Sequence, residues 1–262
     1  MRADVYLTEH GYLSSRKRAQ TLIEAGKVSV DGRVIKKAAQ QIDDGEHNVL
    51  IGESEEARYV GRGGLKLEAA LDAFGIDPHG KYALDIGAST GGFTDCLLQH
   101  GAAKVYAVDA GVGQLAQSLL ENSAVISIEK MNARNLLPEH IGGDSVDIIV
   151  MDVSFISATY IIPRFPALLK EAGEAVCLVK PQFEVGKALI GKGGIVRDSA
   201  AHAAAITRVC ACAESVGLYP IALIPSPIEG GDGNREFLLH LVSTNACNKM
   251  LSQDTILAVT KT

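Results

Sequence analysis

The sequence has little that would take a protein into or across a membrane. No run approaches the ~18 consecutive apolar residues of a membrane helix, and no charged segment followed by an apolar stretch opens the chain. Apolar residues nevertheless make up 47% of the 262 residues, enough for a sizeable core. We therefore expect a cytoplasmic protein without a membrane partner, built as one large domain or as a medium domain plus a small one.

Recognisable cysteine patterns are also missing. The five cysteines show neither a Cys-x-x-Cys pair nor the spacing of a metal site, so no metal site is expected. An odd number of cysteines in a chain of this size indicates reduced thiols that fill the core or a helix. They are Cys96, Cys177, Cys210, Cys212 and Cys247.

Two common nucleotide fingerprints fail at the glycine-rich stretch around which the chain is organised. The dinucleotide pattern needs glycine at its first, third and sixth positions, whereas Gly87 is followed two residues later by Ser89. The phosphate-loop pattern, with its Lys-Ser/Thr, is absent as well. What remains is Asp-Ile-Gly-Ala-Ser-Thr-Gly-Gly-Phe over 85–93, after a strand-like apolar run at 82–84 and before a helical pattern.

This strand, glycine turn and helix predict a ligand site. Glycines let a backbone approach a ligand closely, and the turn leads to a helix N-terminus. The next strand, 104–108, is followed by Asp109, whose carboxylate can accept hydrogen bonds from ribose hydroxyls. We infer a nucleoside-containing cofactor in a doubly wound α/β domain. A dehydrogenase is a weaker alternative, and an ordinary glycine-rich turn without a ligand is the simplest one.

Two further strand ends carry charged residues. Residues 146–151 form an almost uninterrupted apolar run, as expected for a central parallel strand, and Asp152 follows. The run 175–179 is followed by Lys180. Ligands of open parallel sheets bind beyond the carboxyl ends of the strands, so both residues are expected at the ligand edge. A lysine there is costly unless it faces water, an acid or a substrate.

Local patterns predict the remaining elements of this part of the chain. Pro163 and Pro166 should break the helix that we expect over 157–170 near its middle. The tail after Asn245 is left open, as a further helix or as a frayed end. The expected elements are a strand over 125–128, a helix over 157–170, a mobile glycine- and lysine-rich loop over 186–194, a helix over 199–216, and strands over 219–224 and 236–242.

The beginning of the chain differs in charge from the rest. Residues 1–51 carry eight Lys or Arg against seven Asp or Glu, whereas the whole chain has a net charge of −6. Ser14 or Ser15 can cap a helix that ends at Gly26. Asp-Gly between the alternating runs 28–30 and 33–35 is a strong hairpin signal. We expect one helix followed by a hairpin.

Basic residues cluster in this helix and hairpin. Cations in the first turn of a helix oppose its dipole, which suggests that they face an anion. Together with one arginine further along the chain, they form the set of residues that the resemblance described next assigns to RNA binding. The residues are Arg16, Lys17 and Arg18 in the helix, Arg33, Lys36 and Lys37 at the hairpin, and Arg62.

The first 52 residues resemble the S4 RNA-binding domain. The match consists of Ser15-Arg16, Ala19, Ile23, Gly26, Val28, Val30 and Asp31-Gly32 at the family's spacings. The resemblance implies a small α+β domain whose helix and hairpin grip structured RNA, mainly through phosphates. A solvated charged face without a ligand is the alternative.

The rest of the chain carries an ordered series of motifs. The glycine loop resembles the S-adenosylmethionine loop of class I methyltransferases, and the whole series is similar to the TlyA family, often labelled hemolysin A. That family joins an S4 domain to an FtsJ-like (RrmJ-like) methyltransferase. The motifs are Gly-Arg-Gly-Gly-Leu-Lys66, the loop 85–93, Met-Asp152-Val-Ser-Phe-Ile, Val-Lys180-Pro-Gln-Phe-Glu and Asn-x-Glu236.

The resemblance covers nearly the entire chain and implies a domain organisation. An S4 domain over 1–52 is expected to be followed by a linker over 53–62 and a Rossmann-like methyltransferase domain over 63–245. The tail over 246–262 is unassigned. The match is loosest in the linker, where some family members carry a tryptophan and this chain has Tyr59.

The resemblance also implies an activity and its residues. The activity is S-adenosylmethionine-dependent 2'-O-methylation of ribosomal RNA, with cytidine as the nucleoside modified in characterised members. A catalytic tetrad falls on Lys66, Asp152, Lys180 and Glu236. Asn132 lies where such enzymes commonly hold a polar residue against the adenine. The full predicted cofactor set is Asp85, Gly87, Ser89, Thr90, Gly91, Gly92, Phe93, Asp109, Asn132 and Asp152.

The chemistry assigns roles to the tetrad. A ribose hydroxyl must lose its proton as it attacks the sulfonium methyl group, and a lysine can accept that proton only if a nearby cation or desolvation lowers its pKa. We hypothesise that Lys180 is this base and that Lys66 tunes it. Asp152 would orient Lys180, and Glu236 would hold Lys66 or the ribose.

Three other functions compete with RNA 2'-O-methylation. A cytolysin would need a membrane-entering segment and an export signal, and a ribosome-assembly factor would not need an intact tetrad. A base methyltransferase would favour Asn-Pro-Pro-Tyr/Phe or a catalytic cysteine where this chain has Asp-Val-Ser-Phe. We expect ribosomal RNA, within ribosomal subunits, as the partner of a monomeric enzyme.

Overall fold

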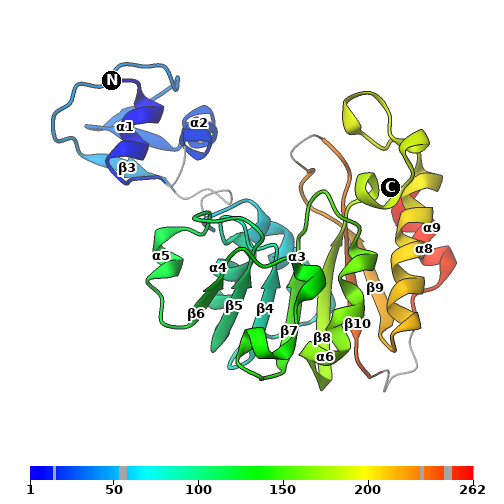
Figure 1. The fold of residues 1–262 in the computed structure, drawn as a ribbon. Coiled ribbons are helices and arrows are strands. Elements are labelled where there is room, and N and C mark those ends of the chain that lie inside the picture. The colour runs from blue at the N-terminus through cyan, green and yellow to red at the C-terminus, as the bar shows by residue number, and fades with distance from the viewer. Residues whose placement is uncertain (14–15, 53–57, 231–232, 245–249, 262) are drawn as a thin grey trace. The chain divides into compact units, whose positions relative to one another are not determined.

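The chain forms two compact units. The computed structural model describes residues 1–13, 16–52, 58–230, 233–244 and 250–261 (Figure 1). Contacts divide it into Met1–Arg62 and Gly63–Thr262, and each unit is described by itself. Throughout the described ranges, no helix combines the length and the apolarity that a membrane crossing would need.

The first unit is a small α+β domain. Two helices, α1 (Ala3–Glu9) and α2 (Arg16–Glu24), accompany a three-stranded antiparallel sheet with the order β2-β1-β3. Asp31 and Gly32 both have positive φ, at 49° and 76°, as a tight hairpin turn requires. The predicted helix and hairpin are confirmed, while Ser14 and Ser15 lie outside the described residues. The strands are β1 (Val28–Val30), β2 (Arg33–Val34) and β3 (Val49–Ile51).

The second unit is a doubly wound α/β domain, which confirms the predicted fold class. Its seven-stranded sheet has the order β6-β5-β4-β7-β8-β10-β9, in which β6 to β8 run parallel and β10 is antiparallel to both its neighbours. The strands are β4 (Tyr82–Ile86), β5 (Lys104–Val108), β6 (Val125–Ile128), β7 (Val146–Met151), β8 (Leu169–Val179), β9 (Tyr219–Pro225) and β10 (Phe237–Val242).

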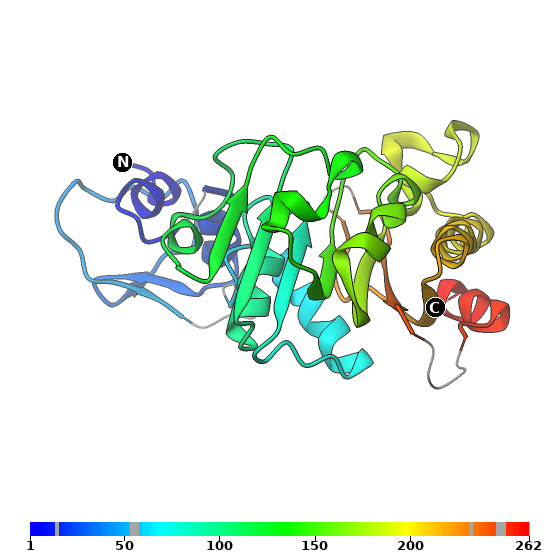
Figure 2. The ribbon, with the colours of Figure 1, turned by 60° about the horizontal axis from the view of Figure 1, so that its bottom comes forward.

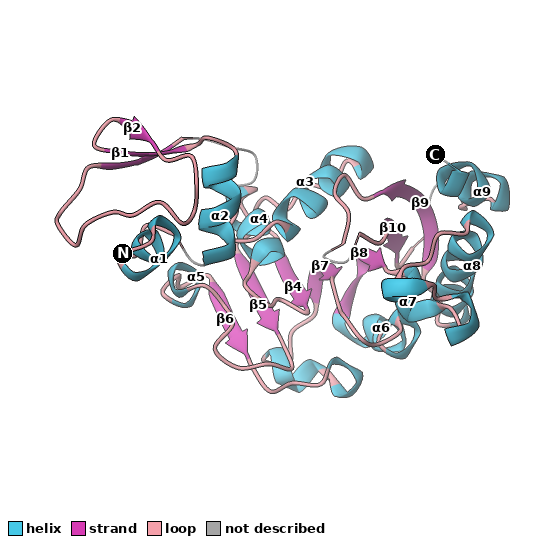
Figure 3. Cartoon of the chain, turned by 90° about the horizontal axis from the view of Figure 1, so that it is seen from above, coloured by secondary structure: helices cyan, strands magenta, loops and turns pink. Residues whose placement is uncertain are grey.

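Helices cover both faces of this sheet (Figure 3). One large apolar core joins β4, β7, β8 and β10 to α6 and α8. The tail forms α9, which packs beside α8 and buries Ile256 (Figure 2). The α-helices are α3 (Gly63–Phe74), α4 (Gly92–Gln99), α5 (Gln117–Leu120), α6 (Phe165–Leu168), α7 (Pro181–Glu184), α8 (Ser199–Ser215) and α9 (Gln253–Lys261).

Short 3-10 helices fill several connections of this unit. They lie within individual loops and do not add a layer to the fold. They are η2 (Ala133–Asn135), η3 (Pro138–Ile141), η4 (Ala158–Tyr160), η5 (Ile162–Arg164), η6 (Lys187–Leu189) and η7 (Lys192–Gly194).

The helix predicted over 157–170, with a break near its middle, is wrong as a single element. The segment consists of η4, η5 and α6, and β8 already begins at Leu169. Pro163 and Pro166 each stand in the first turn of one of these pieces, the position that a proline without an N–H tolerates. The predicted break is therefore real, but it divides the segment into separate short helices. The strand that follows is also longer than the predicted 175–179.

Candidate active site

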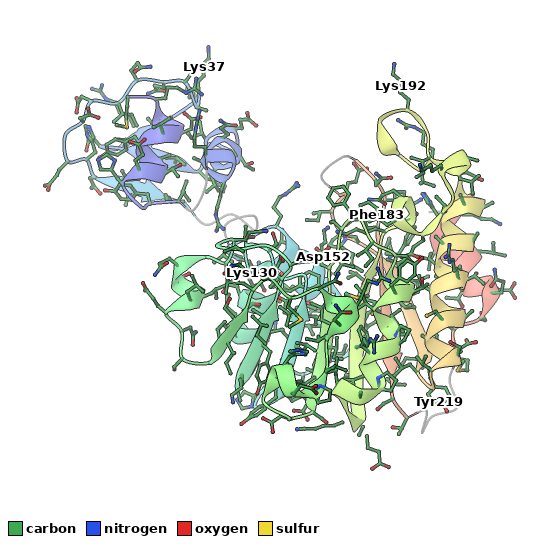
Figure 4. The ribbon with its side chains drawn as sticks, viewed as in Figure 1. Lys37, Lys130, Asp152, Phe183, Lys192 and Tyr219 are labelled. Carbon is green, nitrogen blue, oxygen red and sulfur yellow. The ribbon has the colours of Figure 1, made fainter. Side chains whose placement is uncertain are left out.

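The carboxyl ends of the parallel strands bring most of the predicted site residues to one edge of the sheet. The glycine loop follows β4, Asp109 follows β5, Asp152 follows β7 and Lys180 follows β8. Helix α3 adds Lys66, and the segment before β10 adds Glu236. Figure 4 shows Asp152 and Phe183 at this upper edge, with Tyr219 at the opposite edge.

The glycine loop is shaped by its own packing. Gly87 has φ 87°, and a Cβ built on it would lie 2.4 Å from the carbonyl oxygen of Asp152. Gly91 has φ 96°, and its Cβ would lie 2.2 Å from Leu119 Cδ1. Any side chain at either position would push the loop away from β7 or from α5. These glycines therefore fix the position of the loop whether or not a ligand is bound.

Asp109 joins this loop to the next strand end. Its Oδ2 accepts a hydrogen bond from Ser89 N at 2.8 Å, and its Oδ1 accepts one from Gly111 N at 2.7 Å. Each carboxylate oxygen retains a lone pair for a ligand hydroxyl. A pocket opens here, lined by Ala88, Ser89, Ala107, Asp109, Gly111, Gln114, Leu115, Ser127 and Glu129.

The residues that line the pocket differ at one position from those predicted from the sequence. Asn132 is exposed, does not line the pocket, and accepts a hydrogen bond from Arg134 N at 3.1 Å as the cap of η2. Glu129 lines the pocket instead and accepts a hydrogen bond from Gly113 N at 2.7 Å. Glu129 directly follows β6, as Asp109 directly follows β5, and this recurrence was the signal that could have found it. A contact of Asn132 with the adenine stays a prediction.

Asp85 lies fully buried beneath the glycine loop. Its Oδ2 accepts a hydrogen bond from the Thr94 hydroxyl at 2.6 Å, and no described residue donates to its Oδ1. Burial raises the pKa of Asp85 to about 7, and the negative charges of Asp152 and Asp109 add to the effect. The edge of the sheet therefore contains a carboxyl group with one unsatisfied oxygen.

The four tetrad residues form two ion pairs. Lys180 Nζ lies 2.5 Å from Asp152 Oδ1, and Lys66 Nζ lies 2.5 Å from Glu236 Oε2. Both lysine side chains are only 10% exposed. A Cβ on Gly63, at the start of α3, would lie 4.0 Å from Asp152 Oδ2, so the helix that carries Lys66 begins beside the other pair.

Sequence reasoning assigned no role to Ser154 and Phe155, which lie in the loop after β7. Lys180 Nζ donates a hydrogen bond to Ser154 Oγ at 2.9 Å. Phe155 is 92% exposed, has φ 64°, and its ring centroid lies 5.4 Å from that of Phe183. A bulky residue in the left-handed region is rare, which marks this turn as a built feature. Their place directly after the tetrad aspartate was the available signal.

In the first unit, the predicted RNA-binding residues differ in the solvent exposure of their side chains. Five of them are exposed: Arg16, Arg33, Lys36, Lys37 and Arg62. Arg18 is half-buried and donates to the carbonyl oxygen of Tyr59, whereas nothing is described of the Lys17 side chain. Figure 4 shows Lys37 pointing outward from this unit.

A buried carboxylate organises part of that basic surface. Asp4 accepts hydrogen bonds from Arg2 Nε at 2.9 Å, Gln20 Nε2 at 2.7 Å and Arg16 Nη2 at 3.3 Å. Chiefly through the Arg2 hydrogen bond, these partners hold the pKa of Asp4 well below its usual range. Asp4 thus fixes two arginines whose side chains are 43% and 57% exposed. Arg2 was not among the predicted RNA-binding residues.

Comparison with known proteins agrees with this architecture. The FtsJ-like methyltransferase family model matches residues 59–243, and the S4 domain model matches residues 1–48. The chain is 44% identical over 240 residues to the 16S/23S rRNA (cytidine-2'-O)-methyltransferase TlyA of Mycobacterium tuberculosis, a match that covers 92% of this chain and 89% of that protein.

Two further relatives carry a hemolysin description. Hemolysin A of Brachyspira hyodysenteriae is 41% identical, with 92% of this chain and 100% of that protein covered. A solved structure from Streptococcus thermophilus, provisionally described as a hemolysin, is 40% identical with a TM-score of 0.79, covering 100% of this chain and 94% of that one. The chain belongs to the TlyA family of FtsJ-like methyltransferases that carry an N-terminal S4 domain.

Proposed function

We propose that this protein transfers a methyl group from S-adenosylmethionine to the 2'-oxygen of a cytidine ribose in ribosomal RNA. The observation that carries the proposal is Lys180, held by Asp152 and Ser154 at the ligand edge of the sheet. The name of the Mycobacterium tuberculosis relative supports the substrate. We further propose that the enzyme acts as a monomer, in the cytoplasm, on ribosomal subunits.

The residues at this edge fit S-adenosylmethionine. Asp109 is placed to accept hydrogen bonds from ribose hydroxyls, and a pocket opens beside it. The unsatisfied Oδ1 of Asp85 suits a cationic group, because a positive charge would favour the ionised carboxylate. When bound, the cofactor supplies a methyl group on a sulfonium, which is electrophilic without any metal.

Lys180 is the proposed general base. Lys180 Nζ would accept the proton of the ribose 2'-hydroxyl as that oxygen takes up the methyl group, which the bound cofactor would supply while its remainder leaves as a neutral thioether. Asp152 orients Lys180 and stabilises the ammonium that results. Lys66, paired with Glu236, is a second buried lysine at this edge of the sheet.

The RNA is proposed to bind through two kinds of contact. Exposed arginines and lysines of the first unit contact phosphates, which give affinity but little sequence preference. The exposed ring of Phe155, backed by Phe183, offers a flat apolar surface against which an unstacked base can lie. Sequence-specific recognition of RNA mostly targets single-stranded loops and bulges, whose unstacked bases lie against aromatic side chains, so such a surface suits an RNA substrate.

The test is transfer of a labelled methyl group from S-adenosylmethionine to 30S and 50S subunits that lack the modification. Lys180→Ala should lose at least about 100-fold in rate, the scale of a general base. Lys170→Ala is the matched control, because Lys170 is also paired with an aspartate, Asp147, at the other end of the same strand. It should retain nearly full activity.

Two results would contradict the proposal. Full transfer by Lys180→Ala with normal RNA binding would remove Lys180 as the base. No transfer by the wild type to either subunit, despite measurable cofactor binding, would favour a different RNA substrate or a non-catalytic role in ribosome assembly. Mapping the labelled nucleotide would identify the subunit and the nucleoside.

A further inference from the structure

Lys180 has two oxygen partners, and only Asp152 belongs to the tetrad. The Asp152 carboxylate forms the ion pair, and the Ser154 hydroxyl accepts a hydrogen bond at 2.9 Å. The Lys180 side chain is 10% exposed, so these contacts replace much of the water that would otherwise surround the ammonium. Among the described residues, Nζ has no third acceptor.

This arrangement distinguishes the three N–H positions of the ammonium. One N–H is donated to Ser154, whereas Asp152 Oδ1 accepts no hydrogen bond from the described residues and attracts the ammonium as an ion pair. Loss of the proton that Ser154 accepts would break a hydrogen bond, and the nearby carboxylate repels a lone pair turned toward it. The free amine therefore directs its lone pair away from both oxygens. A lone pair with a fixed direction can receive a proton only from a group placed along it.

We propose that Ser154 is a positioning residue that fixes the direction of the Lys180 lone pair toward the ribose 2'-hydroxyl. Without Ser154, the amine can rotate about its Cε–Nζ bond and place its lone pair at two positions instead of one. The inference rests on the proposed function, because it assigns Ser154 a part in the same proton transfer.

The chain that follows Ser154 is held in place by two features. Phe155, which follows it, has φ 64° and turns the chain directly after the hydroxyl. Two residues further along the same loop donate hydrogen bonds to Glu184: the Ser157 hydroxyl at 2.5 Å and Ala158 N at 2.7 Å. Glu184 is buried in α7, the helix that begins directly after Lys180. The loop that carries Ser154 and the strand end that carries Lys180 are thereby joined.

The test compares Ser154→Ala with Ser154→Thr, which keeps a hydroxyl. Ser154 is exposed, so neither variant should disturb the fold. Ser215→Ala, which removes an exposed hydroxyl on α8, is the control. Ser154→Ala should lower kcat about tenfold, the scale of one hydrogen bond to a charged group, and leave KM for S-adenosylmethionine unchanged.

The pH profile separates positioning from a general packing effect. An acceptor stabilises the ammonium, so its removal should move the acid limb of the kcat profile of Ser154→Ala to lower pH. Ser154→Thr should restore both kcat and the position of that limb. The inference is overturned if Ser154→Ala matches the wild type in both, or if Ser154→Thr is as impaired as Ser154→Ala.

A measurement without substrate distinguishes this inference from the proposed function. Lysine labelled with ¹³C at Cε is titrated by NMR in wild type and Ser154→Ala, with Lys180→Arg used to assign the signal. A lower titration midpoint in Ser154→Ala supports the contact even if no RNA is methylated, in which case only the proposed function fails. An unchanged midpoint in an active enzyme overturns the inference alone.

Discussion

Strand β8 carries a lysine–aspartate pair at each end, and the two pairs differ in their surroundings. At the carboxyl end, Lys180 and Asp152 have side chains that are 10% and 22% exposed. At the other end, Lys170 and Asp147 are 49% and 27% exposed, and Nζ lies 2.9 Å from Oδ1. The residue types are the same at both ends. A catalytic role for Lys180 alone must therefore depend on its burial and on the other residues that lie near it.

The two ends also differ in their neighbours. The carboxyl end gathers a second buried ion pair, an unsatisfied carboxyl oxygen and the exposed ring of Phe155 against that of Phe183. In the middle of β8, Glu174 lies between Lys81 and His240, and hydrogen bonds with both satisfy its charge. Water screens exposed pairs, whereas buried ones interact strongly and are costly to disrupt. The following changes test this contrast.

The largest effect is expected from Glu236→Ala. It leaves the buried Lys66 without its partner, which should lower the free energy of unfolding by about 3 kcal/mol or more. Lys170→Ala, at the exposed pair, should cost less than about 1 kcal/mol. Urea denaturation measures both. The double variant Lys66→Met/Glu236→Met should recover stability without recovering activity, and equal costs for the two single variants would contradict the contrast.

A large effect confined to RNA is expected from Phe155→Ala. Loss of one stacking surface, worth ~1–3 kcal/mol per base, should raise KM for RNA about tenfold. Tyr219→Ala removes another exposed ring, at the opposite edge of the sheet (Figure 4), and should leave KM for RNA unchanged. Steady-state methyl transfer measures both variants. A rise in KM for S-adenosylmethionine in Phe155→Ala would instead indicate damage to the cofactor pocket.

A smaller effect is expected from Gly230→Ala. The added Cβ would lie 2.5 Å from Glu236 Oε1, so the carboxylate must shift and its contact with Lys66 must weaken. Activity should fall severalfold while the fold persists. Gly186→Ala is the matched control, because nothing lies within 4 Å of its Cβ and its φ is −68°. Equal activities in the transfer assay would show that the position of Glu236 does not matter.

The last change concerns the pH dependence of stability that Asp85 contributes. Its folded pKa of about 7 lies above the ordinary value of 3.8, so the folded state holds the proton more tightly between these pH values. Stability should fall as pH rises through this window, and the full penalty is present above pH 7. Asp85→Asn should abolish this dependence in denaturation curves recorded from pH 5 to 8. A wild type equally stable at both ends would contradict it.

The same residue should link pH to cofactor binding. A cationic ligand favours the ionised carboxylate, so affinity for S-adenosylmethionine should increase as pH rises through about 7. Calorimetric titration at several pH values measures it. Asp85→Asn, which can still accept the Thr94 hydrogen bond, should bind with an affinity that no longer depends on this ionisation.

Local patterns predicted much of the fold, because strands, turns and helix ends are encoded by neighbouring residues. The apolar runs ending before Asp109, Asp152 and Lys180 are strands, and Asp31-Gly32 is a hairpin turn. The helix predicted over 157–170 failed because two prolines fit equally well in the first turns of short helices. Periodicity alone does not distinguish a kinked helix from a series of separate ones.

The sequence by itself determined which residues stand at strand ends, and so which side chains share one edge of a parallel sheet. Only the tertiary structure decided their partners. Lys66 meets Glu236 across 170 positions, and Lys180 reaches Ser154 across 26. It also decided that Asp85 is buried with an oxygen unsatisfied and that Phe155 faces solvent. These outcomes depend on strand order and loop packing, which arise from the sum of many distant contacts and leave no local pattern.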